Sequence, residues 1–244
     1  MKQFFNRWSN LIFFCFLFET SLLANKQDED FYQAAKLAQE GEYQKALNLY
    51  TCLETQGPVT YYNSGVMAYY LQDYSKALVF WRKAERYASS GLLKKIQHNT
   101  VQVQEKLQVS ADPEWYKILL SILAHCSYLL FQWVFLVAWF LMWISWLFSC
   151  SVLKKMRYLI CFMVLLTGAI LVGEYWNMTR REAIVMVQEA KIFAGPREDF
   201  HEIGLIKQGE QVKVVGEEES WYKMLYRNNR GWMRKVDLEE TTVE

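Results

Sequence analysis

Two long apolar runs constrain the fold of this chain more than any other feature of its sequence. The first extends from Ile118 to Phe148 and the second from Tyr158 to Trp176. A helix rises about 1.5 Å per residue, so each run is long enough to cross the roughly 30 Å hydrocarbon core of a bilayer. The sequence therefore predicts two transmembrane helices, at residues 117–151 and 158–176, with separate modules before and after them.

The charges between these runs predict their orientation. Lys154, Lys155 and Arg157 lie in the short segment that joins the two helices. Because basic loops stay preferentially on the cytoplasmic side, we expect residues 152–157 to form a cytoplasmic turn. The modules before and after the helices would then both be extracytoplasmic.

The N-terminus has the pattern of a secretory signal peptide. Basic residues precede a short apolar run from Leu11 to Phe18, which Glu19 interrupts before it could span a bilayer. We expect cleavage after Ala24, which would remove residues 1–24. An uncleaved anchor is the alternative, because Leu22 is larger than the residues usually found next to the cleavage site.

The composition argues against several classes of function. The formal net charge is +1 and the basic residues are scattered, so no patch for nucleic acid is evident. The five cysteines form no CxxC pair, and the three histidines lie in different segments, which leaves no spacing suited to zinc. His125 and Cys126 are adjacent in the first apolar run, where a polar site is an open alternative. The sequence shows no group of a nucleophile, a base and an orienting residue. We therefore expect no metal, no cofactor, no catalytic residue and no enzyme activity.

Residues 28–109 contain two copies of one helical pattern. The first includes AAKLAQEGEYQKALNLY and the second YYNSGVMAYYLQDYSKALVFWRKAER. In each copy an apolar helix ends at a polar turn and a second helix follows, with alanines where the two would approach closely and aromatic rings in the wider gaps. The stretch SGLLKKIQHNTVQVQEKLQV carries one apolar stripe and would cap the two hairpins. The matched positions are Tyr43, Ala46 and Tyr50 in the first copy and Tyr74, Ala77 and Trp81 in the second.

The period of the apolar pattern changes after Thr179. Over residues 182–240, short runs alternate apolar and polar residues between glycine-containing turns, which predicts a small all-β barrel. Trp221 and Tyr222 are neighbours on one predicted strand, so their rings face opposite sides of the sheet. We expect Trp232 in the core and Tyr222 as the more exposed ring, and leave Trp221 open between the two roles.

Both soluble segments resemble known domain families. The helical copies resemble tetratricopeptide repeats, in which Gly41 and Gly65 follow the family pattern while Gln72 replaces the turn glycine of the second copy. The segment with GEQVKVV, SWYKM and RGWM resembles a bacterial SH3-type domain. The resemblances imply protein-binding repeats with a capping helix, and an aromatic-lined groove in which Trp221 and Tyr222 are the candidate ligand-binding residues.

The order of the modules is similar to that of BatE-type proteins of bacterial aerotolerance operons. The similarity includes YYNSGVMAYY, HNTVQVQEKL and SWYKM. It implies a multidomain membrane protein of the bacterial inner membrane, with all-α helix hairpins, two transmembrane helices and a small all-β barrel. It also implies a membrane-anchored scaffold that acts beside von Willebrand factor A membrane proteins and a MoxR-type ATPase in envelope maintenance or stress tolerance. The alternative is a cell-wall-binding module in which the SH3-type domain holds peptidoglycan and the repeats recruit an envelope enzyme.

Overall fold

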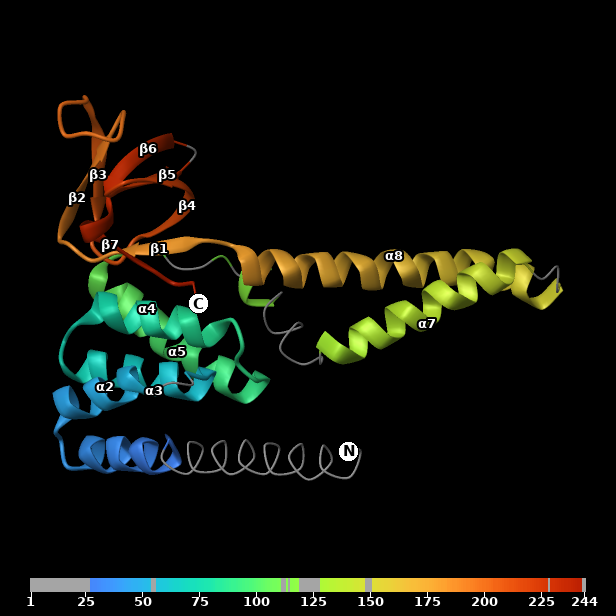
Figure 1. Cartoon of the computed structure of the whole chain (residues 1–244), viewed down its shortest axis with the longest axis horizontal. Helices are drawn as coiled ribbons and strands as arrows, with labels where there is room; N and C mark the ends of the chain where they lie inside the picture. The colour runs from blue at the N-terminus through green and yellow to red at the C-terminus, as the bar shows by residue number, and fades with distance from the viewer. Residues whose placement is uncertain are drawn as a thin grey trace, which may run out of the picture. The chain divides into compact units, whose positions relative to one another are not determined.

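The computed structural model describes residues 27–53, 56–110, 113, 115–118, 128–147, 151–227 and 229–242. The chain divides into two compact units, Met1–Ala84 and Glu85–Glu244. Figure 1 shows helices in the first unit, and helices together with a β-sheet in the second. The predicted signal peptide and the pair of His125 and Cys126 lie outside the described residues.

The described part of the first unit is helical. Residues 27–39 form a helix, and three further helices follow it along the chain. Pro58 lies in the first turn of its helix, where the missing N–H would have no partner within the helix anyway. The three helices are α2 (Tyr43–Cys52), α3 (Pro58–Tyr70) and α4 (Tyr74–Glu85).

The core of the first unit uses the residues that the repeated pattern singled out. Ala46 and Ala77 are fully buried at positions where only small side chains let helices approach. Gly65 lies so close to the indole of Trp81 that a Cβ atom there would overlap the ring. The indole Nε1 of Trp81 also donates a hydrogen bond to the backbone carbonyl of Tyr62 at 3.3 Å. Small residues and large rings are therefore matched between α3 and α4.

The helices of the second unit precede its sheet. They include α5 (Ser90–Leu107), α7 (Tyr128–Leu147) and α8 (Ser151–Thr179). The stripe predicted on α5 is buried at Leu93, Ile96 and Val103. Helices α7 and α8 contact each other. Arg157 of α8 donates a hydrogen bond to the carbonyl of Ser145 in α7 at 2.7 Å.

The structure corrects the prediction for the apolar runs. A helix that crosses a bilayer needs about 20 successive and mostly apolar residues. Within the described part of the chain, no helix combines sufficient length with sufficient apolar character to do so. This finding contradicts the two transmembrane helices expected at residues 117–151 and 158–176, and the inner-membrane localisation with two spans that depended on them. The basic segment 152–157, expected as a turn, lies within α8.

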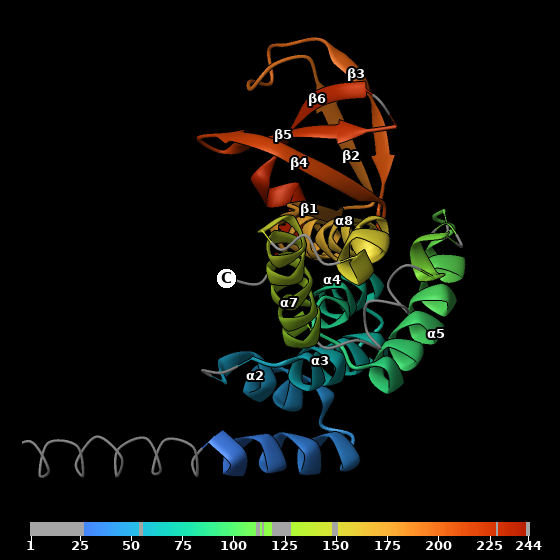
Figure 2. The same cartoon turned by 90° about the vertical axis from the view of Figure 1, so that its right-hand side faces the viewer.

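The C-terminal part of the second unit is an antiparallel sheet of seven strands, in agreement with the all-β segment predicted over residues 182–240. The strand order is β3-β2-β6-β5-β4-β1-β7, and Figure 2 shows β4, β5 and β6 side by side. A short 3-10 turn, η1 (Lys235–Asp237), precedes the last strand. The strands are β1 (Glu182–Val185), β2 (Glu189–Phe193), β3 (Glu202–Lys207), β4 (Gln211–Glu218), β5 (Trp221–Tyr226), β6 (Asn229–Arg234) and β7 (Leu238–Glu240).

Alternation along the strands builds the core of this sheet. Successive side chains point to opposite faces, so the inward residues are apolar and most of the outward ones are charged. Glycine and methionine take the buried positions of β6 on either side of Trp232, which is only half-buried. The prediction that Trp232 lies in the core is therefore wrong. The core cluster comprises Ala183, Val185, Ala190, Ile192, Ile206, Val212, Val214, Met224, Met233 and Leu238.

Candidate functional site

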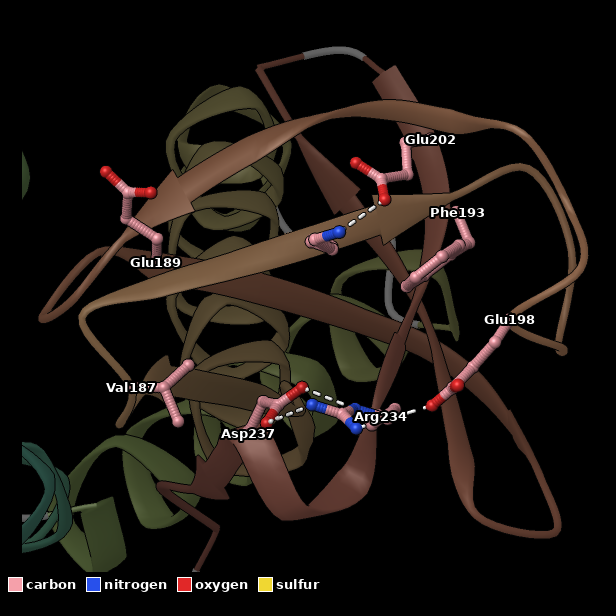
Figure 3. A pocket seen from close by; sticks show the side chains of 8 residues that line it. Val187, Glu189, Phe193, Glu198, Glu202, Arg234 and Asp237 are labelled. Carbon is pink, nitrogen blue, oxygen red and sulfur yellow. Dashed lines mark hydrogen bonds and ion pairs between the residues drawn. The ribbon is translucent and has the colours of Figure 1, made fainter.

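A groove in the sheet domain lies between the β2–β3 hairpin and η1. Figure 3 shows its side chains arranged around a hollow, which has a volume of about 410 Å³. We call it the charged groove, because most of the side chains that line it are ionisable. Its lining consists of Val187, Glu189, Lys191, Phe193, Glu198, Glu202, Arg234 and Asp237.

The alternation of β2 positions one wall of the charged groove. Ala190 and Ile192 of this strand are buried in the core, so Glu189 and Lys191 project from the opposite face toward solvent. The register between β2 and β3 shifts next to Phe193, and this residue is buried although it follows the buried Ile192. The same strand therefore contributes two charged side chains and one buried aromatic ring to the groove.

Ion pairs fix several of the charged side chains. Lys191 Nζ lies 2.5 Å from a carboxylate oxygen of Glu202 on the neighbouring strand. Arg234 Nε donates to Asp237 at 2.9 Å, and its Nη1 lies 3.3 Å from Glu198 in the β2–β3 loop. The hydrogen bond with Asp237 raises the pKa of the Arg234 guanidinium above its usual value. Arg234 thus links the η1 turn to the hairpin that faces it across the groove.

The lining carries a surplus of negative charge. It holds four carboxylates, two cations and two apolar side chains. Both cations are engaged with carboxylates of the groove itself. Glu189 is exposed, and its side chain makes no ion pair or hydrogen bond among the residues that the structure describes. The Glu189 carboxylate is therefore available to bind a ligand with an ammonium or guanidinium group.

The two aromatic residues predicted to bind a ligand do not line the charged groove. Trp221 is buried, with 9 % of its surface exposed, and its ring meets that of Phe193 edge to face at a centroid distance of 5.4 Å. It therefore supports the groove through Phe193. Tyr222, the next residue, is half-buried among charged side chains elsewhere on the domain.

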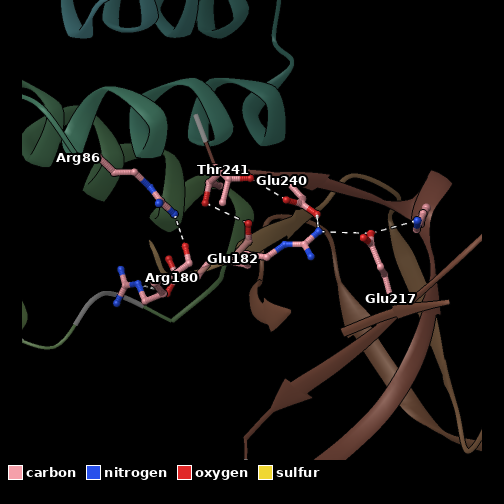
Figure 4. Close-up of polar contacts among 9 residues, drawn as sticks. Arg86, Arg180, Glu182, Glu217, Glu240 and Thr241 are labelled. Carbon is pink, nitrogen blue, oxygen red and sulfur yellow. Dashed lines mark hydrogen bonds and ion pairs between the residues drawn. The ribbon is translucent and has the colours of Figure 1, made fainter. Parts of the chain in front are cut away.

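The surroundings of Tyr222 form a polar cluster that joins three strands. Arg181, just before β1, lies 2.6 Å from Glu240 of β7 and 3.4 Å from Glu217 of β4. Lys235 Nζ is 3.2 Å from Glu217 and 5.1 Å from the centroid of the Tyr222 ring. Figure 4 shows the carboxylates of Glu217 and Glu240 in this cluster, with dashed lines that mark their ion pairs. These contacts close the end of the sheet, so we assign the cluster a structural role.

The pKa values in this polar cluster follow from its contacts. Burial, together with the hydrogen bond to Glu240, raises the pKa of Tyr222 to about 12. Hydrogen bonds from Lys235 and Arg181 lower the pKa of Glu217 below its usual value. For Glu240, burial raises the pKa, but hydrogen bonds from Arg181 and other donors outweigh it and leave the pKa lowered. The cluster is therefore built around a neutral phenol and two ionised carboxylates.

The repeat positions predicted in the first unit are packing and turn residues. Gly41 has a φ of 82° in the turn before α2, a conformation that glycine adopts readily. Tyr43 stacks on Tyr70 with ring centroids 4.7 Å apart. The ring of Tyr74 meets that of Tyr69, and Tyr50 accepts a hydrogen bond from Asn63 at 3.4 Å. The remaining positions, Ala46, Gly65, Ala77 and Trp81, form the matched core of small and large residues.

The charged groove was not predicted from the sequence, because the candidate ligand-binding residues were aromatic and the groove is lined mainly by charged side chains. The signal was nevertheless present in the alternation of β2, where EAKIF places charged residues outside and apolar ones inside. The charged stretch Arg197–Asp199 then follows in the loop that faces the η1 turn. Outward charges on a strand beside a charged loop are thus the sequence pattern that indicates this groove.

Comparison with known proteins identifies the domain that holds the groove. Residues 189–239 match the family described as bacterial SH3 domain. No curated protein and no solved structure gave a match to the chain. The matched segment contains every residue of the charged groove except Val187. Bacterial SH3 domains commonly mediate binding to proteins or to the cell wall, so the match supports a binding role in general.

Proposed function

We propose that this chain is a non-catalytic adaptor, in which the bacterial SH3 domain binds a peptide segment of a partner protein in the charged groove. The observation that carries the proposal is the groove itself, a hollow of about 410 Å³ inside the matched segment. Its side chains come from β2, from the β2–β3 loop and from η1, so a bound peptide would contact three different parts of the domain. The apolar surface of Val187 lies beside these charges and can accept the aliphatic stem of a long side chain.

The helical part would supply a second binding surface. We propose that residues 28–109 are two tetratricopeptide repeats with a capping helix. Support comes from the two turns at Gly41 and Gln72, which have the same backbone hydrogen-bond pattern. The partners remain those implied by the BatE-type resemblance, von Willebrand factor A proteins and a MoxR-type ATPase in a bacterial envelope or stress-tolerance complex. Cross-linking in intact cells, followed by mass spectrometry of the linked proteins, tests this partner assignment.

A cell-wall ligand is the second candidate, because bacterial SH3 domains commonly bind either class. The side chains that line the charged groove favour a peptide ligand over a glycan ligand. Its one aromatic ring, Phe193, is 7 % exposed and offers no open face on which a sugar could stack. Binding of the intact chain to purified cell wall, with loss of that binding after glycan digestion, would favour the second candidate.

Hydrogen exchange of the full chain tests the location of the site. Peptides that bind in the charged groove should protect the amides of β2, the β2–β3 loop and η1 and leave those of β4 unchanged. A ligand that instead protects β4 and β7, around Tyr222, would move the site to the polar cluster. The control is the same measurement on Arg234→Gln, which loses the link between η1 and the β2–β3 loop. In this variant the protection of η1 and that of the loop should decrease together.

A further inference from the structure

The charge of the lining identifies the class of ligand more narrowly. We propose that the charged groove selects a cationic peptide segment, with a lysine or arginine side chain seated against Glu189. This inference rests on the proposed function, because it names the ligand of the same groove. Four carboxylates against two cations leave the lining with a net negative charge. An acidic or neutral peptide would gain nothing from this surplus.

The distribution of the ion pairs gives the cation a place. Asp237 is buried and accepts from Arg234, and Glu198 also faces Arg234, so the negative charge at that end is compensated. At the other end Glu189 is exposed and unengaged among the described residues, and Val187 lies beside it. A ligand cation therefore belongs at the Glu189 end, with its aliphatic stem along Val187.

Lys191 lies two residues from Glu189 on the same exposed face of β2, so its positive charge acts on a ligand cation bound at Glu189. Its Nζ pairs with Glu202, and both side chains are about half exposed. Exposed ion pairs of this kind are weak, so the pair with Glu202 leaves Lys191 able to repel a ligand cation at Glu189. Lys191 therefore repels the ligand cation, whereas Glu189 attracts it. The two residues should affect binding in opposite directions.

Two substitutions on β2 test this opposition. Glu189→Gln removes the unengaged carboxylate and should weaken binding of a cationic peptide by roughly two- to fivefold, the range expected for an exposed ion pair. Lys191→Gln removes the repelling charge beside Glu189 and should strengthen the same binding by a similar factor. Both side chains are exposed, so neither change alters the core.

Matched controls separate the groove from the net charge of the chain. Glu218→Gln and Lys213→Gln make the same two charge changes at exposed positions of β4, outside the groove. They should leave the affinity unchanged. If each control shifts the affinity as much as its partner on β2, the effect is long-range electrostatics and the inference is wrong.

The probes are three short dye-labelled peptides, in which alanine alternates with lysine, glutamine or glutamate, titrated against the full chain by fluorescence polarisation. The expected result is binding of the lysine peptide alone, weakened by salt, with opposite effects of Glu189→Gln and Lys191→Gln. Equal binding of the lysine and glutamine peptides would keep the groove as a peptide site and overturn its preference for cations. Binding of purified wall fragments, with no binding of any peptide, would overturn both this inference and the proposed peptide function.

Discussion

Gly41 and Gln72 occupy the same position in two turns that share one backbone hydrogen-bond pattern. Both residues have a positive φ, 82° for the glycine and 62° for the glutamine. In each turn the residue at positive φ donates to the third carbonyl before it, and the next residue donates to the fifth, which is the arrangement of a helix ending in a Schellman motif. The four bonds are Gly41 to Ala38, Glu42 to Leu37, Gln72 to Tyr69 and Asp73 to Ala68.

The glutamine should therefore be less stable in its turn than the glycine is. A side chain in the left-handed conformation costs about 1–2 kcal/mol relative to the right-handed one, and glycine avoids this cost. We expect Gln72→Gly to stabilise the first unit by about 1 kcal/mol. Hydrogen exchange of α3 and α4 in the full chain measures the change.

The reverse substitution is the control for this prediction. A Cβ at Gly41 would meet no atom within 4 Å, so Gly41→Gln should destabilise the first unit through backbone conformation alone. Equal exchange rates in all three proteins would contradict the assignment of strain to Gln72.

Gly65 and Trp81 give a second prediction, which concerns packing. A methyl group at Gly65 would overlap the indole, so Gly65→Ala should destabilise the first unit by about 1–3 kcal/mol. The smaller ring of Trp81→Phe should relieve much of this overlap, so the double variant should lose less than the two single losses combined. Exchange of α3 and α4 gives the four values of the cycle. Strictly additive losses would mean that the two residues do not press on each other.

The sequence predicted those features that depend on local periodicity. The helical character of the first unit followed from the spacing of Ala46 and Ala77, and both alanines are buried as expected. The small sheet followed from alternation between residues 182 and 240. Apolar length alone did not suffice to predict membrane helices, since no helix over the described residues meets the requirements for a span.

The site was harder to predict because it depends on contacts between distant segments. Glu189 and Arg234 line the same groove although they lie far apart in the chain. The register shift beside Phe193 buries a residue that simple alternation would place outside. The alternation of the strand correctly predicted that Trp221 and Tyr222 lie on opposite faces. That both rings lie outside the lining of the groove did not follow from the sequence.

The two tryptophans of the sheet give a third prediction. Trp221 is buried against Phe193, whereas Trp232 is half-buried with the ammonium of Lys223 5.6 Å from its ring centroid. Replacing a buried tryptophan with alanine removes about 3–5 kcal/mol, so Trp221→Ala should unfold or nearly unfold the domain. Trp232→Ala should cost clearly less. Amide exchange across β4, β5 and β6 distinguishes the two, and a larger loss for Trp232→Ala would contradict the burial described above.

The last prediction concerns the alkaline titration of Tyr222. Its pKa is raised to about 12 by burial and by the hydrogen bond to Glu240, whereas a free tyrosine titrates near 10. A folded-state pKa above the unfolded value means that the folded protein holds the phenolic proton more tightly. The corresponding stabilisation is complete below about pH 10 and is lost as the pH rises toward about 12. Tyr222→Phe cannot ionise, so it should lack this alkaline loss while forfeiting the hydrogen bond to Glu240 at neutral pH.

The difference in tyrosinate absorbance between the wild type and Tyr222→Phe isolates this one phenol among the other tyrosines. We expect the difference spectrum to show a midpoint near 12, and a midpoint near 10 would show that Tyr222 is neither buried nor bonded to Glu240 in solution.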